Sequence, residues 1–217
     1  MLPLTNNRLL CPSAPSVAGV EAELRSKPHL KSDCRYTSRH VRRDFRDARQ
    51  AESAVEAMGK VPAPDEAIHL AVSGRFALWH MVPATMKISG SKLASLRIAT
   101  LGFSKKNVSG LCDLIDAGEV DHVRLLASHY FKGTSNEIYT FAETELAKRE
   151  GRADFLSVRT HAKLLLMELD DGRKITVESS ANLRSCKNIE QMTIVGDPGL
   201  YDFHAGWMRC SPRPRDD

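Results

Sequence analysis

The sequence predicts an α/β fold, in which a mixed, mainly parallel sheet is flanked by helices and carries one antiparallel hairpin. Two observations predict it. From residue 65 onward, apolar segments of strand length alternate with amphipathic segments of helix length, as in α/β proteins. Further along, Asp-Asp-Gly-Arg (residues 170–173) separates two segments rich in strand-forming residues, which is typical of a hairpin turn.

The expected strands are apolar segments bounded by polar or turn-forming residues. The first contains a Ser-Gly break at residues 73–74, which indicates a kink or bulge. The strand after the hairpin turn is expected to return antiparallel to the one before it. The expected strands are residues 67–79, 96–104 and 122–131, one or two strands within 153–169, and 174–182.

The expected helices combine helix-forming residues with recognisable ends. The segment 105–120 places Val108, Leu111, Cys112 and Ile115 on one face, and Gly118 marks its end. The segment 135–150 follows Ser135 as N-cap and would bury Ile138, Phe141, Ala142 and Leu146. The expected helices are residues 35–58, 105–120, 135–150 and 199–210.

The charge of the chain is concentrated near its N-terminus. A length of 217 residues suits one domain with appendages, and the formal net charge is +4. Residues 1–63 contain 11 Lys and Arg against 7 Asp and Glu, whereas the remainder is balanced. We therefore expect an irregular N-terminal segment with an Arg-rich helix (1–63), a neutral domain (64–210) and a short tail (211–217).

The Arg-rich helix has two possible roles. Arg35, Arg39, Arg42, Arg46 and Arg49 follow three- and four-residue steps and can share one face. Such a face can bind a polyanion, in which case Arg39, Arg42 and Arg46 are the expected contacts. It can equally be a solvated surface with Arg–Asp pairs, and the sequence favours neither role.

Composition also limits the compartment and the cofactors. Five cysteines, an odd number without C-x-x-C spacing, favour free thiols over a disulfide framework or a zinc site. The His residues show no ligand spacing, so no metal or other cofactor is expected. No segment approaches the roughly 18 apolar residues of a membrane helix, and the first residues lack a signal-peptide pattern. A cytoplasmic location without membrane insertion is the expectation.

The hairpin carries the most informative polar residues. In a strand, alternate residues share a face, so His161 and Lys163 are expected to point the same way. On the returning strand, Glu178, Ser180 and Asn182 are expected to point together. The two groups lie at the hairpin end away from its turn and can meet there. A buried His or Lys needs a partner, although an exposed strand end would need none.

These residues resemble a known signature. His161-Ala-Lys163, a hydrophobic run, Glu168 and then Ser-Ser-Ala-Asn (179–182) resemble the phospholipase D superfamily pattern H-x-K-x4-D followed by G-S-x-N. Asn-Ile-Glu (188–190) resembles the acidic motif of the single-motif members, which are phosphodiesterases and nucleases. The resemblance spans about 30 residues in motif and about 150 in strand and helix pattern, which also fits the superfamily's α/β fold.

The resemblance implies a mechanism. His161 would attack phosphorus and form a phosphohistidine. Lys163 and Asn182 would hold the nonbridging oxygens as their charge is redistributed, and Ser180 would add a hydroxyl contact. Glu190 would hydrogen-bond and orient the site histidine.

The resemblance also implies partners. A second histidine must protonate the leaving group. The chain has one H-x-K, and His129 with Lys132 has the wrong spacing for a second copy. A homodimer sharing one site is therefore implied, and the scheme needs no metal. The nuclease-like members and the basic N-terminal arm make nucleic acid, in the first place DNA, the expected substrate. Arg184 and Lys187 are candidate phosphate contacts, or solvated surface cations.

Two departures from the signature keep alternatives open. Glu168 replaces the motif Asp and has the opposite parity to His161, so a structural role pointing away from the site is expected. Ser179 replaces the first Gly of G-S-x-N. The alternatives to a nuclease are a lipid phosphodiesterase or phosphatidyltransferase of the same fold, a non-catalytic nucleic-acid-binding module on that scaffold, and a plain α/β binding domain.

Overall fold

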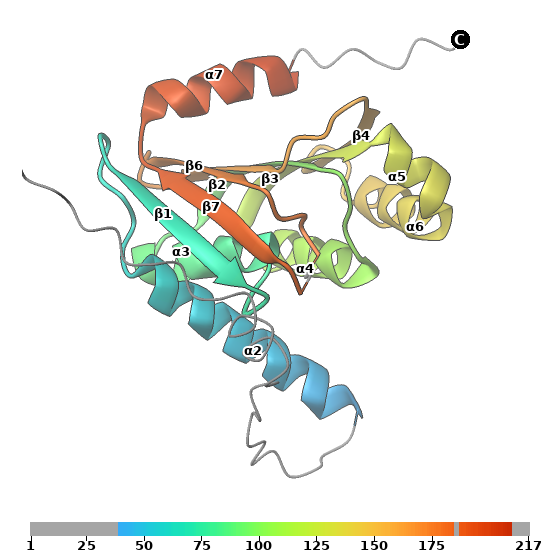
Figure 1. Ribbon diagram of the computed structural model, residues 1–217. Coiled ribbons are helices and arrows are strands. Elements are labelled where there is room, and N and C mark those ends of the chain that lie inside the picture. Colours follow the sequence, from blue (N-terminus) through green and yellow to red (C-terminus); the bar gives the residue numbers. More distant parts are fainter. Residues whose placement is uncertain (1–38, 185–186, 210–217) are drawn as a thin grey trace, which may run out of the picture. The chain divides into compact units, whose positions relative to one another are not determined.

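The computed structural model describes the backbone of residues 39–184 and 187–209, and side chains from residue 47 onward within those ranges. Apart from Arg39, all described residues belong to one compact unit. Its centre is a seven-stranded sheet in the order β1-β7-β6-β5-β2-β3-β4 (Figure 1). The strands are β1 (Ala67–Ser73), β2 (Leu93–Thr100), β3 (Val120–Ser128), β4 (Ala153–Val158), β5 (Leu164–Leu169), β6 (Lys174–Ser179) and β7 (Ile189–Val195).

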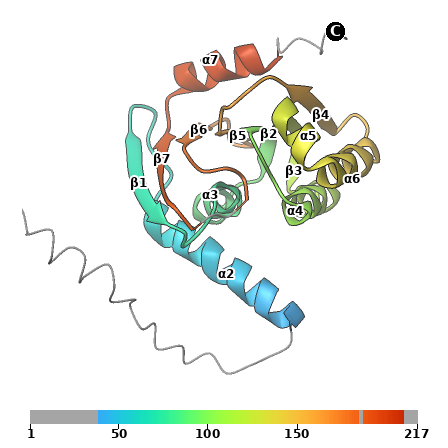
Figure 2. The same cartoon turned by 45° about the vertical axis from the view of Figure 1, so that its right-hand side comes forward.

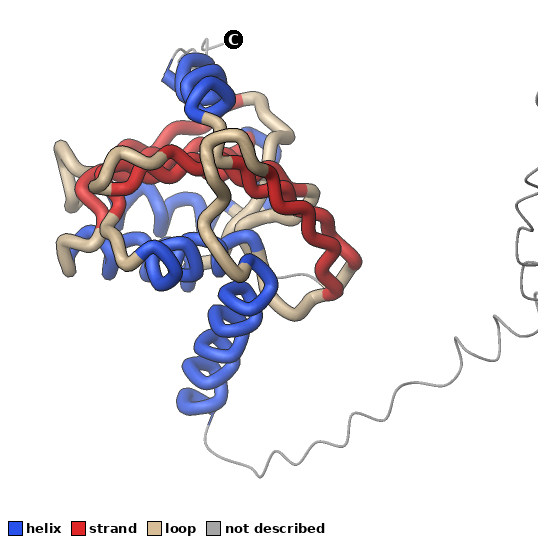
Figure 3. The backbone as a smooth tube through the Cα atoms, turned by 90° about the vertical axis from the view of Figure 1, so that its left-hand side faces the viewer, coloured by secondary structure: helices blue, strands red, loops and turns tan. Residues whose placement is uncertain are grey.

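The helices lie on both faces of this sheet. Figure 3 shows the strands as one layer between helices, and Figure 2 shows α7 on one side and α2, α3 and α4 on the other. The helices are α2 (Arg39–Met58), the short 3-10 helix η1 (Leu78–His80), α3 (Met81–Ser89), α4 (Lys105–Asp116), α5 (His129–Thr134), α6 (Asn136–Ala147) and α7 (Pro198–Arg209). None of the described helices has the length and apolar character that crossing a membrane requires.

The sheet is mixed, as expected, but the expectation that it is mainly parallel is wrong. Only the pairs β2–β3 and β3–β4 are parallel, and the other four pairs are antiparallel. One antiparallel pair that the sequence did not reveal joins β5 to β2. Two more involve β7, to which the sequence analysis assigned no strand and which lies between β1 and β6, antiparallel to both.

Two apolar cores hold the layers together. The larger core joins one sheet face to α2, α3, α4 and α6, and includes Met58 of α2 and Leu165 and Met167 of β5. The smaller core joins the other face to α7 through Leu166 and Tyr201 among others. Alternating residues of β5 therefore serve opposite cores, as the two-residue period of a strand requires.

Several elements match the sequence expectations closely. In α4, Val108, Leu111, Cys112 and Ile115 are all buried, and Gly118 after the helix has a φ of 69°. The segment 153–169 forms two strands, β4 and β5, and the turn joins β5 to β6 as an antiparallel pair. The first strand differs, because β1 ends at Ser73 and the chain turns at Gly74, whose φ is also 69°.

Strand direction sets the position of the polar residues. β5 runs antiparallel to β2 and to β6, so the start of β5 lies beside the ends of β2 and β6. The ends of β3 and β4 and the start of β7 lie at this same edge. We call it the carboxyl edge, after the carboxyl ends of the parallel strands.

Candidate active site

His161 and Lys163 lie in the segment that leads into β5 at the carboxyl edge. His161 is exposed and Lys163 is half-buried. Lys163 Nζ lies 3.0 Å from His161 Nδ1 and 2.9 Å from the His161 carbonyl oxygen. A charged lysine has no acceptor, so it donates to Nδ1, and a neutral His161 ring then carries its proton on Nε2.

The Lys163 ammonium is influenced by burial and by one carboxylate. Burial lowers the pKa of Lys163 from its ordinary value, and the negative charge of Glu190 partly opposes this. Glu190 lies on β7 with the parity of Met192, a residue of the larger core. Leu165, which shares the parity of Lys163, belongs to that core as well. Lys163 and Glu190 therefore occupy the same side of the sheet.

Ser180 links the end of β6 to Glu190. Its hydroxyl donates a short hydrogen bond to Glu190 Oε2 and accepts one of 3.0 Å from the Gln191 amide. The neighbouring Ser179 hydroxyl donates to the Gln191 carbonyl (3.0 Å) and accepts from the Ala181 amide (2.9 Å). Because the Ser180 proton is used by Glu190, the Ser180 oxygen has acceptor capacity left but no free donor.

The structure separates residues that the sequence analysis expected on one face. Glu178 faces α7, where its Oε1 lies 3.0 Å from His204 Nε2. Ser180 instead contacts Glu190 on the opposite side of the sheet. The physical reason is that β6 ends at Ser179, so the two-residue alternation does not continue to Ser180 and Asn182.

Asn182 lies in a segment anchored to the end of β2. The amide of Leu183 donates to Thr100 Oγ1 at 3.3 Å, and this hydroxyl also bonds to Gly102. The Asn182 Oδ1 atom is buried and has no hydrogen-bond partner among the described residues. An unsatisfied buried acceptor is costly, and functional sites are one of the places where it is found. Thr100 was missed because a Thr at a strand end carries no distinctive sequence signal.

The other candidate contacts differ in how far the structure describes them. Arg184 is exposed, and its side chain lies beside Gly102. A Cβ atom placed on Gly102 would be 3.7 Å from Arg184 Nε. Lys187 is exposed at the far side of the same loop. The side chains of Arg39, Arg42 and Arg46 lie outside the described residues, although α2 begins at Arg39 as a helix.

Glu168 contributes to the opposite face of the sheet. The Tyr201 hydroxyl donates to its Oε2 at 3.4 Å, and Tyr201 belongs to α7. Burial and the Glu168 charge raise the pKa of Tyr201 to about 12. The expected orientation of Glu168 away from His161 is therefore found, and its partner is a structural one.

The carboxyl edge also carries residues that the signature did not identify. His129 begins α5, and its Nδ1 lies 2.8 Å from Ser157 Oγ on β4. Arg159 is exposed directly after β4, two residues before His161. Among the described residues, no three His, Cys, Asp or Glu side chains are placed to hold a metal ion.

A separate cavity lies at the opposite edge of the sheet. It has a volume of about 430 Å³ and is lined by residues 60–64 and the hairpin turn, among others. Its cations Lys60, Arg173 and Lys174 are paired with Glu66, Asp171 and Asp202 at 2.6–2.7 Å. The residues of the candidate active site lie at the carboxyl edge, not in this cavity.

Comparisons with known proteins provide evidence on the fold. The chain matches no protein-family profile and no curated protein. It is similar to a polyphosphate kinase from Porphyromonas gingivalis, with 12% identity and a TM-score of 0.50 over 69% of this chain and 27% of that one. It also matches a mutant of yeast tyrosyl-DNA phosphodiesterase, with 16% identity and a TM-score of 0.30 over 48% of this chain and 24% of that one. The chain thus spans about a quarter of each protein, and its fold is similar to a part of the polyphosphate kinase.

Proposed function

We propose that the chain is a phosphodiesterase of the phospholipase D type, acting as a metal-independent DNA endonuclease through a phosphohistidine. The observation that carries the proposal is the contact between His161 and Lys163 at the carboxyl edge, beside the Ser180–Glu190 pair. A fold shared with a polyphosphate kinase, an enzyme of the phospholipase D superfamily, also supports it.

The resting contact suggests how the site becomes reactive. With Lys163 donating to Nδ1, the Nε2 atom of a neutral His161 holds the proton and has no free lone pair. A bound phosphodiester offers two nonbridging oxygens that attract the Lys163 ammonium more strongly than the ring does. When Lys163 moves to the phosphate, the ring proton can shift to Nδ1 and Nε2 becomes the nucleophile.

The reaction then proceeds in two balanced steps. In the first, the Nε2 lone pair forms a bond to phosphorus while the bond to the leaving oxygen breaks, and that oxygen takes a proton from a second histidine. In the second step, a water molecule gives a proton to that second histidine. The water oxygen then bonds to phosphorus as the bond from phosphorus to Nε2 breaks. We propose that the second histidine is His161 of another copy of the chain, so that the site is shared in a homodimer.

Lys163 and Asn182 would stabilise the transition state. A donor held towards a developing oxyanion typically contributes about 10²–10³ in rate. Lys163 can move from His161 to a nonbridging oxygen, and the Asn182 amide group can donate its N–H to another. Ser180, whose proton is used by Glu190, would hold the Glu190 carboxylate in place.

The test is cleavage of DNA by the full chain in excess EDTA, with wild type and His161→Ala in parallel. We expect cleavage by wild type, loss of at least about 10³-fold in His161→Ala, and an acid-labile phosphate on His161 during turnover. Abolition of wild-type cleavage by EDTA, or full activity of His161→Ala, contradicts the proposal. A strictly monomeric active protein contradicts the shared site alone.

A further inference from the structure

The carboxyl edge carries cations that no carboxylate neutralises. Lys132, Arg159, Arg184 and Lys187 are all exposed, and none forms an ion pair with a described residue. Of the carboxylates at this edge, Glu190 accepts the Ser180 hydroxyl and Glu178 contacts His204. Elsewhere in the described unit, exposed basic groups are commonly paired, as in Lys105–Glu137. Unpaired cations on one edge form an electrostatic site for a polyanion.

An exposed aromatic ring lies at the same edge of the sheet. Tyr130, the second residue of α5, is 68% exposed, and its amide is fixed by a hydrogen bond to Ser128 Oγ. Its ring packs against no other aromatic ring among the described residues. A large aromatic side chain that is exposed rather than packed presents an unused flat face.

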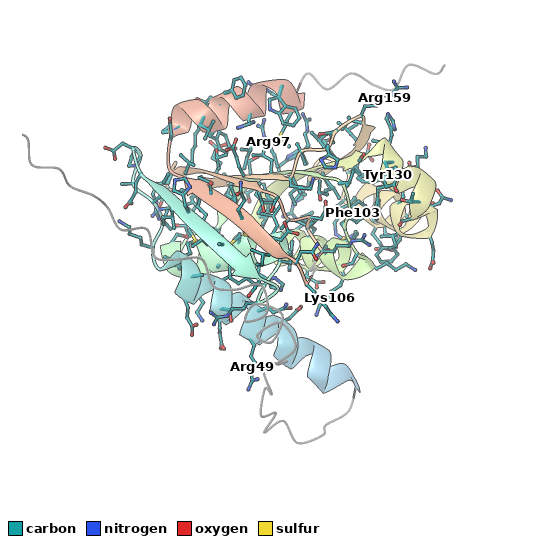
Figure 4. The ribbon with its side chains drawn as sticks, in the orientation of Figure 1. Arg49, Arg97, Phe103, Lys106, Tyr130 and Arg159 are labelled. Atoms are coloured by element: carbon teal, nitrogen blue, oxygen red, sulfur yellow. The ribbon has the colours of Figure 1, made fainter. Side chains whose placement is uncertain are left out.

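Strand pairing brings the segments that carry Tyr130 and Arg159 out of the sheet at neighbouring strand ends. Ser128 of β3 pairs with Val158 of β4, so both chains leave the sheet at the same level. Figure 4 shows Tyr130 at α5 and Arg159 just beyond the end of β4. Arg159 is two residues before His161, which is about 7 Å along an extended chain.

We infer that Tyr130, together with Arg159 at the neighbouring strand end, is a base-stacking subsite that makes single-stranded nucleic acid the preferred substrate. The inference rests on the proposed function and names its substrate class. Cations alone bind single and double strands alike through phosphates. Tyr130 discriminates, because an unpaired base has a free face to stack on the ring, whereas a base in a duplex already stacks on its neighbours.

The test measures binding separately from cleavage. Full-length protein with His161→Ala, which prevents cutting, is titrated against a fluorescent oligothymidine of about 20 nucleotides, longer than the roughly 4–16 nucleotides that comparable sites cover. The same strand in a duplex is the second probe. We expect Tyr130→Ala to weaken single-strand binding about 10-fold and to change duplex binding by less than about 2-fold. Tyr130→Phe keeps the ring and is expected to retain single-strand binding.

Two matched variants complete the design. Phe203 on α7 is 67% exposed, nearly as much as Tyr130, but α7 packs on the opposite face of the sheet from α5, so Phe203→Ala is expected to leave the binding of both probes unchanged. Arg159→Ala is expected to weaken both probes and to reduce the salt slope for the single strand by about 0.7. Equal losses of single-strand and duplex binding in Tyr130→Ala, an equal loss in Phe203→Ala, or no binding of either probe overturns the inference.

Failure of the inference and failure of the proposed function are distinguishable. Hydrolysis of bis(4-nitrophenyl) phosphate, a phosphodiester without bases, is measured on wild type and His161→Ala. Absent hydrolysis together with Tyr130-dependent single-strand binding contradicts the proposed function but supports the subsite. Hydrolysis that depends on His161, together with unchanged binding in Tyr130→Ala, supports the function and overturns the subsite.

Discussion

Replacing Lys163 by Met tests the chemical role of the site with little change in shape. Met keeps an unbranched apolar side chain but removes the ammonium group. The substitution deletes both hydrogen bonds to His161, at 3.0 Å to Nδ1 and 2.9 Å to the carbonyl oxygen. It also removes the positive charge with which Glu190 interacts at this position. We expect a large loss of activity in a protein that folds normally.

The expected size of the loss follows from the environment of Lys163. An ordinary neutral hydrogen bond contributes about 0.5–1.5 kcal/mol, which is roughly tenfold in rate at most. Lys163 is charged and half-buried, which strengthens its interaction with a developing phosphoryl charge. We therefore expect the loss typical of a missing oxyanion donor, about 10²–10³ in kcat, or about 2.7–4 kcal/mol.

Folding stability is expected to change in the opposite direction. Because burial lowers the pKa of Lys163 from 10.5, the unfolded chain holds this proton more tightly than the folded one does. The charged group thus opposes folding at neutral pH, and this penalty disappears as the pH rises towards 10.5. Lys163→Met removes the penalty, so its melting temperature at neutral pH is expected to equal or exceed that of wild type.

Initial rates on bis(4-nitrophenyl) phosphate measure the loss of activity, and thermal melts on the same samples measure the change in stability. Lys87→Met is the matched control, since Lys87 is an exposed lysine of α3 remote from His161 in the fold, and its rates are expected to equal those of wild type. A rate for Lys163→Met within about threefold of wild type, with the melt unchanged, refutes the transition-state role of Lys163.

Two further predictions concern stability. Gly196→Ala places a Cβ 2.1 Å from the Ala63 carbonyl oxygen, so the backbone must move, and we expect a loss of about 1–3 kcal/mol and a melting temperature lower by roughly 2–12 °C. Gly206→Ala in α7 meets nothing within 4 Å and is expected to leave stability unchanged or raise it; equal melts for the two variants contradict the clash. Since the pKa of Tyr201 is raised to about 12, its hydroxyl keeps the proton in the folded state, whereas the unfolded state loses this proton above about pH 10. The free energy of unfolding is therefore expected to fall by up to about 2–3 kcal/mol as the pH rises from about 10 to about 12. Urea unfolding at about pH 8 and about pH 11 checks this, and Tyr201→Phe is expected to lose that part of the alkaline sensitivity; an identical pH dependence in the variant contradicts the assignment.

The elements that could be predicted are those with strong local signals. α4 has apolar residues at helical spacing and a Gly after its end, and all four of its predicted core residues are buried. The hairpin of β5 and β6 has a turn sequence between two apolar strands. In both cases, residues within one element contain the information, so no knowledge of distant contacts is needed.

The part of the fold that could not be predicted depends on distant contacts. β7 has seven residues, but its polar Glu190, Gln191 and Thr193 interrupt the apolar ones, so its hydrophobic pattern is weak. It becomes a strand because it has hydrogen-bonding partners on both sides, β6 and the sequence-distant β1. The two antiparallel pairs of β7, and the antiparallel pairing of β5 with β2, are the contacts that make the expectation of a mainly parallel sheet wrong.

The candidate site shows the same division. The proximity of His161 and Lys163 follows from their spacing of two, and the contact at 3.0 Å agrees with it. The Ser180–Glu190 pair could not be derived from alternation, because β6 ends one residue before Ser180. The position of Glu190 beside Ser180 depends on β7, the strand that the sequence did not reveal.

Net charge is a poor guide to where this protein would bind an anion. Residues 64–217 contain equal numbers of acidic and basic residues, from which no attraction to a polyanion follows. The folded unit nevertheless pairs many cations away from the carboxyl edge, such as Arg149 with Asp116, and leaves Arg159 and Arg184 unpaired at it. A neutral domain can therefore present a positive edge beside His161, because folding distributes the pairs unevenly.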